Sequence, residues 1–113
     1  MTKGKIVLVP FPFDDLSSTK LRPAVCLTEP IGVHRHIILA FITSRVPPDL
    51  LRTDIILESS QQDFLLTGLR VTSTLRLHRM ITLSASFIRR ELGLLSPQKQ
   101  AEIVRILRQL FEG

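Results

Sequence analysis

Aromatic residues are scarce in this chain, and that scarcity limits the kinds of binding surface that it can build. Tryptophan and tyrosine are absent from the 113 residues, and six phenylalanines supply the whole aromatic content. Proteins that bind single-stranded nucleic acid by stacking bases on their surface usually present more aromatic side chains. A surface built mainly from stacking platforms is therefore disfavoured.

Cysteine is almost absent as well, since Cys26 is the one thiol in the sequence. A single cysteine cannot form an intramolecular disulfide, which suits a cytoplasmic protein. Cys26 lies in an apolar run at residues 24–27, where a buried and unreactive thiol is more common than a nucleophile. We therefore expect Cys26 to belong to the core.

The sequence also lacks the short motifs that mark common metal and phosphate sites. It contains no glycine-rich phosphate loop, no CxxC pair and no HExxH motif. His34 and His36 lie two residues apart, but no carboxylate or cysteine stands close to them, so we predict no metal site. The apolar N-terminal stretch ends at Pro10 and Pro12, so the sequence predicts neither a signal peptide nor a membrane span.

Positive charge is what the chain has in excess. Its 15 Lys and Arg residues against 10 Asp and Glu residues give a formal net charge of +5 and a pI near 10.4. This balance favours an anionic partner, namely nucleic acid, an acidic protein or a membrane surface, although a small basic domain can also simply be well solvated. Most of the cations are arginines, which suit bidentate phosphate contacts better than lysine.

The length and the apolar pattern predict a single domain, residues 1–113, with a packed core. Apolar and β-branched runs predict six strands, at residues 6–11, 23–28, 35–44, 53–59, 69–83 and 87–95. The third run is continuous enough to be a central strand. Residues 14–21 form a loop, and residues 60–68 form another, with room for one helical turn before a positive φ at Gly68.

The fifth run alternates over much of its length, which predicts two unlike faces. One side carries mostly apolar residues: Val71, Ser73, Leu75, Leu77 and Arg79. The other side is polar and basic: Arg70, Thr72, Thr74, Arg76 and His78. We expect the apolar side to face the core and the basic side to face solvent or a ligand.

The C-terminal segment predicts a helix that begins after Ser96, a good N-cap, with Pro97 at the first helical position. Val104, Leu107 and Phe111 fall on one face, and that face is flanked by Ile103, Ile106 and Leu110. This wide apolar stripe must pack against a sheet or a second subunit. The whole pattern predicts an α+β, mostly β fold: a small antiparallel sheet, forming a partial barrel, with one packed C-terminal helix.

The residues that can carry chemistry are basic or hydroxylic, and they stand at strand ends. Arg22 opens the second strand, Thr43 and Ser44 close the third, and Arg70, Arg76 and His78 share the polar side of the fifth. Arginine can bind a phosphate and stabilise charge that grows during transfer, a hydroxyl can hydrogen-bond a phosphate oxygen, and histidine can move protons near neutral pH. Together these are the ingredients of a phosphodiester site.

Each of these residues also has an ordinary structural explanation. Arg and Thr are common at strand ends, and a histidine such as His78 is more often a half-exposed strand residue than a catalyst. Asp14 and Asp15 are adjacent, so in a strand they would point apart, and a solvated acidic loop explains them. Arg89 and Arg90 suit a solvated face.

Three segments resemble the MazF/PemK family of toxins from type II toxin–antitoxin systems. The opening GKIVLVPFPFDDLSSTKLRPAVCL is similar to the family's first strand, polar loop and Arg-Pro strand. IILAFITS resembles its third strand, which ends in a threonine, and GLRVTSTLRLHRMITL with LGLLSPQKQAEIVRILRQL resembles its late strand and C-terminal helix. The likeness covers nearly the whole chain.

This resemblance implies a small SH3-like antiparallel β-barrel that works as a homodimer. It implies a metal-independent, cofactor-free endoribonuclease, an mRNA interferase that cuts single-stranded RNA at short sequences. Attack by the 2′-OH on the adjacent phosphate would leave a 2′,3′-cyclic phosphate and a 5′-OH. It also implies a cognate antitoxin whose acidic, partly disordered tail blocks the RNA groove.

Carried over residue by residue, the resemblance assigns the arginine of the Arg-Pro pair to Arg22 and the strand-end threonine to Thr43, both as catalytic residues. Ser44 would assist them, and Arg76 stands near the place of a family arginine. The loop that lines the RNA groove includes Ser17, Ser18, Thr19 and Lys20.

Two positions depart from the family pattern. Gly4-Lys5 stands where the family commonly has Gly-Asp, which adds positive charge at the surface. His78 stands where some relatives carry a late-strand aspartate with a catalytic role, so that it either replaces the carboxylate as a proton carrier or marks the loss of that role.

Two other functions fit the same fold. A toxin that poisons gyrase acts by protein contact and does not cut RNA, and it tends to depend on aromatic residues near its C-terminus. Phe111 stands there, at a helix-face position where packing would explain it. A catalytically silent relative that only binds RNA or antitoxin is the third interpretation. The Arg22–Thr43 pair favours cleavage.

Overall fold

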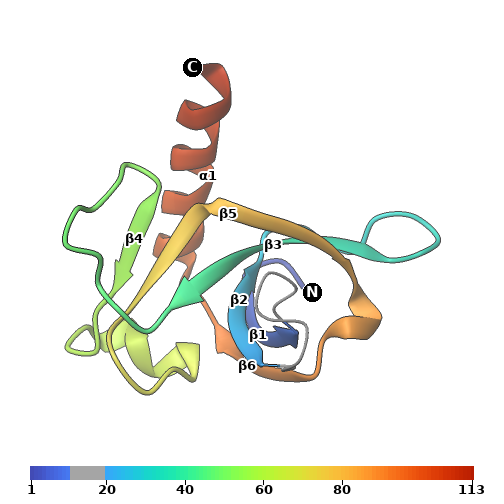
Figure 1. Ribbon diagram of the computed structural model, residues 1–113, viewed down its shortest axis with the longest axis horizontal. Helices are drawn as coiled ribbons and strands as arrows, with labels where there is room; N and C mark the ends of the chain where they lie inside the picture. Colours follow the sequence, from blue (N-terminus) through green and yellow to red (C-terminus); the bar gives the residue numbers. More distant parts are fainter. Residues whose placement is uncertain (11–19) are drawn as a thin grey trace.

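The computed structural model describes residues 1–10 and 20–113, which form a six-stranded antiparallel sheet with one long helix (Figure 1). The strands are β1 (Lys5–Pro10), β2 (Leu21–Cys26), β3 (His36–Thr43), β4 (Asp54–Leu57), β5 (Ser73–Ser84) and β6 (Arg90–Leu94). Short 3-10 helices, η1 (Gln62–Thr67) and η2 (Ala85–Phe87), flank β5, and α1 (Pro97–Glu112) follows β6. The order β4-β5-β3-β2-β1-β6 confirms the predicted fold and the central place of β3.

The sheet is curled, and each of its faces covers an apolar core. Along β3, Ala40 and Ile42 belong to the core under α1, whereas Leu39 and Phe41 belong to the core of the opposite, concave face. Because both faces are buried, β1 to β3 read as continuous apolar runs rather than as alternating ones. Cys26 lies in the concave core, where burial raises the pKa of its thiol to about 11, as expected for an unreactive cysteine.

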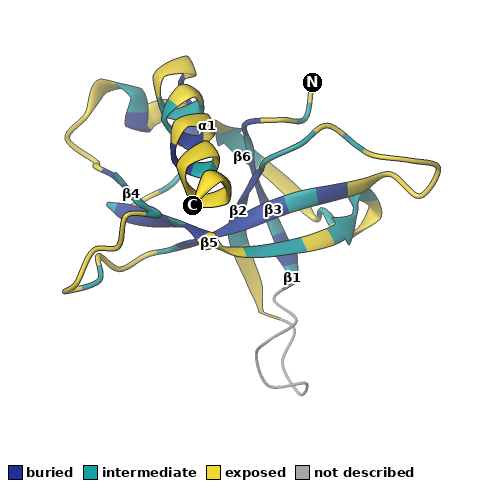
Figure 2. Cartoon of the chain, turned by 90° about the horizontal axis from the view of Figure 1, so that it is seen from above, coloured by how far each residue is buried: buried dark blue, intermediate teal, exposed yellow. Residues whose placement is uncertain are grey.

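The helix α1 packs on the sheet, but through a different face from the one that the sequence pattern centres on. Ser96 caps it by accepting a hydrogen bond from the Lys99 N–H at 3.2 Å. Ile103 and Ile106 are buried against the sheet, while Phe111 is 75% exposed. Figure 2 shows that most of α1 is exposed and that buried positions occupy only part of its surface. Phe111 lies about a third of a turn away from the buried pair, on the last turn of α1. Phe111 is therefore not packed on the sheet of its own chain, and its packing against a second subunit stays a prediction.

Strand β5 carries an irregularity that changes which of its residues share a face. Ala40 pairs with Met80 and Ile42 pairs with Leu75, so residues 76–79 lie opposite the single residue Phe41. Extra residues of this kind shift the alternation of side chains along a strand. Leu75 and Leu77 pack in the core under α1, whereas Ile81 and Leu83 pack in the concave core.

The predicted faces of the fifth run are corrected at three residues. Val71 was expected on the side that faces the core, but it is 52% exposed. Arg79 was expected beside Leu75 and Leu77, but it is the last residue of the irregularity and is exposed on the concave side. Thr74 was expected on an open polar face, but it is fully buried. Its hydroxyl donates to the carbonyl of Arg45 at 2.8 Å, which satisfies a buried polar group.

Gly68 has the positive φ that the sequence predicts, at 72°, and it ends η1. A Cβ placed there would lie 2.1 Å from the carbonyl oxygen of Leu92 in β6. Only glycine lets these two backbone segments approach so closely.

Candidate functional site

Arg22 and Thr43 come together because each continues a row of concave-face residues on a neighbouring strand. Arg22 stands two residues before Ala24 on β2, and Thr43 stands two residues after Phe41 on β3. Ala24 pairs with Phe41, so the same register carried two residues further places Arg22 opposite Thr43. The two side chains predicted from the sequence therefore reach one end of the concave face together.

Pro23 explains why this end of the sheet stays open. The β2–β3 pairing covers only residues 24–26 of β2, and Pro23, which has no N–H to donate, stands just before it. The β1 side remains paired, with Leu8 opposite Pro23 and Val9 opposite Arg22. At Arg22, strand β2 is thus paired with β1, and its pairing with β3 begins only at Ala24. The strand starts at Leu21, two residues before the expected start at Pro23.

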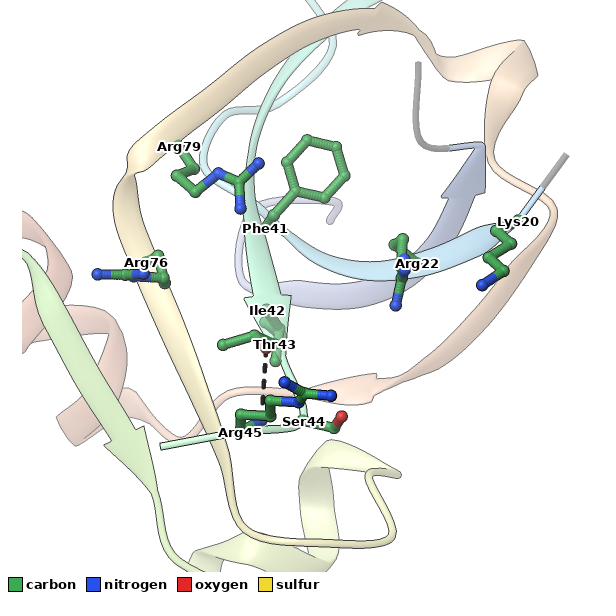
Figure 3. Close-up of a pocket in the computed structure, with 9 residues that line it drawn as sticks. All are labelled: Lys20, Arg22, Phe41, Ile42, Thr43, Ser44, Arg45, Arg76 and Arg79. Atoms are coloured by element: carbon green, nitrogen blue, oxygen red, sulfur yellow. Dashed lines mark hydrogen bonds between the residues drawn. The ribbon is translucent and has the colours of Figure 1, made fainter. Parts of the chain in front are cut away.

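The space between these strands is an open pocket of about 520 Å³ (Figure 3). Its lining is strongly basic: Lys20, Arg22, Phe41, Ile42, Thr43, Ser44, Arg45, Arg76 and Arg79. None of the described residues that line it carries a carboxylate or an imidazole. A concave site lined by several cations attracts anions, and its size suits a phosphate with part of the group attached to it.

Thr43 and Ser44 bring hydroxyls into this basic surface. The Thr43 hydroxyl oxygen accepts a hydrogen bond from the Arg45 N–H at 3.4 Å (Figure 3). Its own proton is thus available for another acceptor, since a hydroxyl can donate one bond while accepting others. Thr43 is half-buried and Ser44 is exposed, so both are accessible from the pocket.

Arg76 contributes to the wall of the pocket, but its charge is turned away from the centre. Its Nε donates to Asp54 Oδ1 at 2.9 Å and its Nη2 donates to Asp54 Oδ2 at 3.3 Å. Asp54 lies directly opposite Arg76 in the β4–β5 pairing, and its side chain is fully buried. Figure 3 shows the Arg76 guanidinium pointing to the β4 side. Arg76 therefore ties β4 to β5 rather than facing Arg22.

His78 stands apart from this site. Its Nδ1 lies 2.7 Å from the Thr53 hydroxyl, and the residue is not among those that line the pocket. Arg70 is exposed outside the strand and also does not line it. The structure thus gives the late-strand histidine a partner in the segment before β4.

The remaining sequence-predicted residues fall in three groups. Lys20 and Ser44 line the pocket with Arg22 and Thr43. Ser17, Ser18 and Thr19 lie outside the described residues, as do Asp14 and Asp15. His34 and His36 have ring centroids 5.9 Å apart, and no cluster of three metal-ligating side chains occurs within residues 1–10 and 20–113.

Sequence reasoning did not select two cations that line the pocket, Arg45 and Arg79. Arg45 directly follows Thr43 and Ser44, and this position could have indicated that it belongs to the site. Arg79 had no such signal, because the irregularity in β5 brings it to the concave side.

None of the helices in the described part of the chain is long and apolar enough to cross a membrane.

The curled sheet and the pocket together define a small, mostly β protein with a strongly basic concave site beside strand-end hydroxyls. Residues 2–111 match the model of a protein family described as the PemK-like, MazF-like toxins of type II toxin–antitoxin systems. This chain belongs to that family.

Solved structures share the fold along nearly the whole chain. An endoribonuclease in complex with its cognate antitoxin from a mycobacterial species aligns with a TM-score of 0.70 and 13% identity, over 99% of this chain and 95% of that one. The Mycobacterium tuberculosis toxin MazF-mt6 aligns at 0.69 and 20% identity, over 96% of both chains. MazF from Deinococcus radiodurans aligns at 0.69 and 16% identity, over 100% and 97%. No curated protein matches the sequence significantly.

Proposed function

We propose that this toxin is a metal-independent endoribonuclease that cuts single-stranded RNA in the pocket between β2, β3 and β5. The observation that carries the proposal is the meeting of Arg22 and Thr43 at one end of the concave face, in a pocket lined by further cations. Two of the similar structures are endoribonucleases, which agrees with this choice. A protein that acts only by surface contact has no need of this arrangement.

The proposed reaction uses a nucleophile that RNA carries itself. The ribose 2′-oxygen loses its proton and bonds to the adjacent phosphorus, and the bond from phosphorus to the 5′-oxygen of the next nucleotide breaks. That 5′-oxygen gains a proton, which leaves a 2′,3′-cyclic phosphate and a 5′-OH. No oxidant, reductant or water is consumed in this step.

Arg22 and Thr43 would act on the phosphate rather than on the nucleophile. The guanidinium of Arg22 would bind the non-bridging oxygens and stabilise the negative charge that grows on them. Thr43 would donate its hydroxyl proton to one of the same oxygens, because its oxygen is already held by the Arg45 N–H. Their support by paired strands would keep both groups in place before RNA arrives.

We further propose a cytoplasmic homodimer that is neutralised by a cognate antitoxin with an acidic, partly disordered tail. The charge of the pocket suits an acidic segment as well as it suits RNA. Exposed apolar residues on α1, with Val104 at 40% and Phe111 at 75% exposure, are side chains that a second subunit would cover. The mass of the purified protein in solution tests the dimer.

Digestion of RNA in EDTA, with chemical mapping of both new ends, tests the proposed function. We expect cleavage at a short recurring sequence and products that carry a cyclic phosphate and a 5′-OH. A well-folded protein that cuts no RNA under these conditions would contradict the proposal. That result would favour a toxin that acts by protein contact, and gyrase inhibition would then be measured.

A further inference from the structure

The proposed chemistry gives no role to the side chain of Arg45, which lies just beyond the end of β3. Arg45 follows the Thr43-Ser44 pair and lines the same pocket. In Figure 3 its guanidinium lies on the side of the pocket where Arg22 and Lys20 are found. An arginine in this place adds a second planar, bidentate phosphate ligand beside the first.

The backbone of Arg45 is fixed at both of its polar atoms. Its N–H donates to the Thr43 hydroxyl oxygen at 3.4 Å, and its carbonyl accepts from the Thr74 hydroxyl at 2.8 Å. Thr74 is fully buried and pairs with Thr43 across β3 and β5. Arg45 is therefore held in a defined position relative to Thr43, although it stands beyond the last residue of β3.

Arg45 and Arg76, which lies on the opposite wall, differ in whether a described carboxylate pairs with the guanidinium. Arg76 is neutralised by Asp54, whereas among the described residues no carboxylate lies within ion-pair distance of Arg45. The side chain of Arg45 is exposed, so a ligand can reach it.

We propose that Arg45 binds the phosphate of a nucleotide next to the one that is cleaved. The pocket would then hold two consecutive phosphates of one strand, the scissile phosphate at Arg22 and Thr43 and its neighbour at Arg45. Arg45 would strengthen RNA binding without stabilising the transition state more than the bound substrate. This inference rests on the proposed function, because it takes the scissile phosphate to be the one at Arg22.

The test measures RNA binding and the chemical step separately. The probe is a single-stranded RNA that the wild-type protein cuts, synthesised with 2′-deoxyribose at the mapped cut position so that it binds but stays intact. Arg45→Ala is compared with wild type over a series of salt concentrations. Arg105→Ala is the matched control, since Arg105 lies on the exposed side of α1 outside the pocket.

For Arg45→Ala we expect a dissociation constant raised by about tenfold and a salt slope that is shallower by about one. The single-turnover rate on saturating cleavable RNA should stay within about twofold of wild type, and Arg105→Ala should change neither quantity. Equal binding by Arg45→Ala and Arg105→Ala overturns the proposal. A lower saturating rate with unchanged binding overturns it as well, because it places Arg45 in the chemical step.

Failure of the proposed function gives a different result from failure of this inference. If the wild-type protein cuts no RNA, the endoribonuclease proposal fails. The same salt-dependent binding comparison on the unmodified RNA then still decides whether Arg45 contacts a phosphate.

Discussion

At the scale of single residues, the pocket separates groups that face the ligand from groups that hold the walls. Arg22 and Thr43 end rows of concave-face side chains and open into the pocket. Arg76 is held by Asp54, and His78 by Thr53. Two arginines, Arg22 and Arg76, thus have different roles because Arg76 is hydrogen-bonded to a buried carboxylate and Arg22 opens into the pocket.

Thr43→Val should slow cleavage by about 10- to 100-fold, because it removes one hydrogen bond to the charged phosphate while keeping the shape of the side chain. Single-turnover rates and binding of the 2′-deoxy RNA would be measured together. Thr82→Val, a change at an exposed threonine of β5, is the control. An unchanged rate for folded Thr43→Val would remove this hydroxyl from the mechanism.

His78→Gln should leave the pH dependence of cleavage unchanged, because the imidazole is hydrogen-bonded to the Thr53 hydroxyl and does not line the pocket. A histidine that acts as the general acid or base would give the profile a limb near neutral pH. The check is a pH–rate profile of both proteins at saturating RNA. The loss of such a limb in the variant would return His78 to the catalytic residues.

At the scale of elements, the junction of β3 and β5 positions one side of the pocket. The hydroxyl of Thr74 reaches from β5 to the backbone of Arg45, just beyond the end of β3. The irregularity that follows in β5 then brings Arg79 to the concave side. One short stretch of β5 thus both anchors the β3 end and supplies a cation.

Thr74→Val should lower the free energy of unfolding by about 1 kcal/mol, because a buried hydrogen bond is replaced by a methyl group of similar size. It should also weaken RNA binding in the same direction as Arg45→Ala, since Arg45 loses its anchor. Urea unfolding and the binding assay check the two effects, with Thr82→Val as the reference. Unchanged stability and unchanged binding would show that the bond does not position Arg45.

The sequence predicts the elements well but not how β5 and α1 are oriented. All six strands, the N-cap at Ser96 and the positive φ of Gly68 are confirmed, with shifts at the strand ends. Arg79 was placed on the wrong side because strict alternation cannot anticipate an irregularity in a strand. Phe111 is largely exposed on its own chain, because the contact face of α1 depends on where the sheet lies beneath it.

At the scale of the whole molecule, the site depends on how strands distant in the sequence are paired. Arg22 and Thr43 were selected from strand ends and from the family resemblance, and pairing of β2 with β3 brings them together. Sequence spacing gives no register, so it could not show that His78 would face Thr53 or that Arg45 would join the pocket. The excess of positive charge was visible from the start, and the fold concentrates part of it on one concave face.

The most direct test of the account is the cleavage rate of Arg22→Ala in EDTA, measured beside wild type and Arg105→Ala on the same RNA. We expect a rate at least about 100-fold lower for Arg22→Ala, with the same unfolding midpoint as wild type, and an unchanged rate for Arg105→Ala. Cleavage at the wild-type rate by a folded Arg22→Ala protein would contradict the central claim that this pocket cuts RNA.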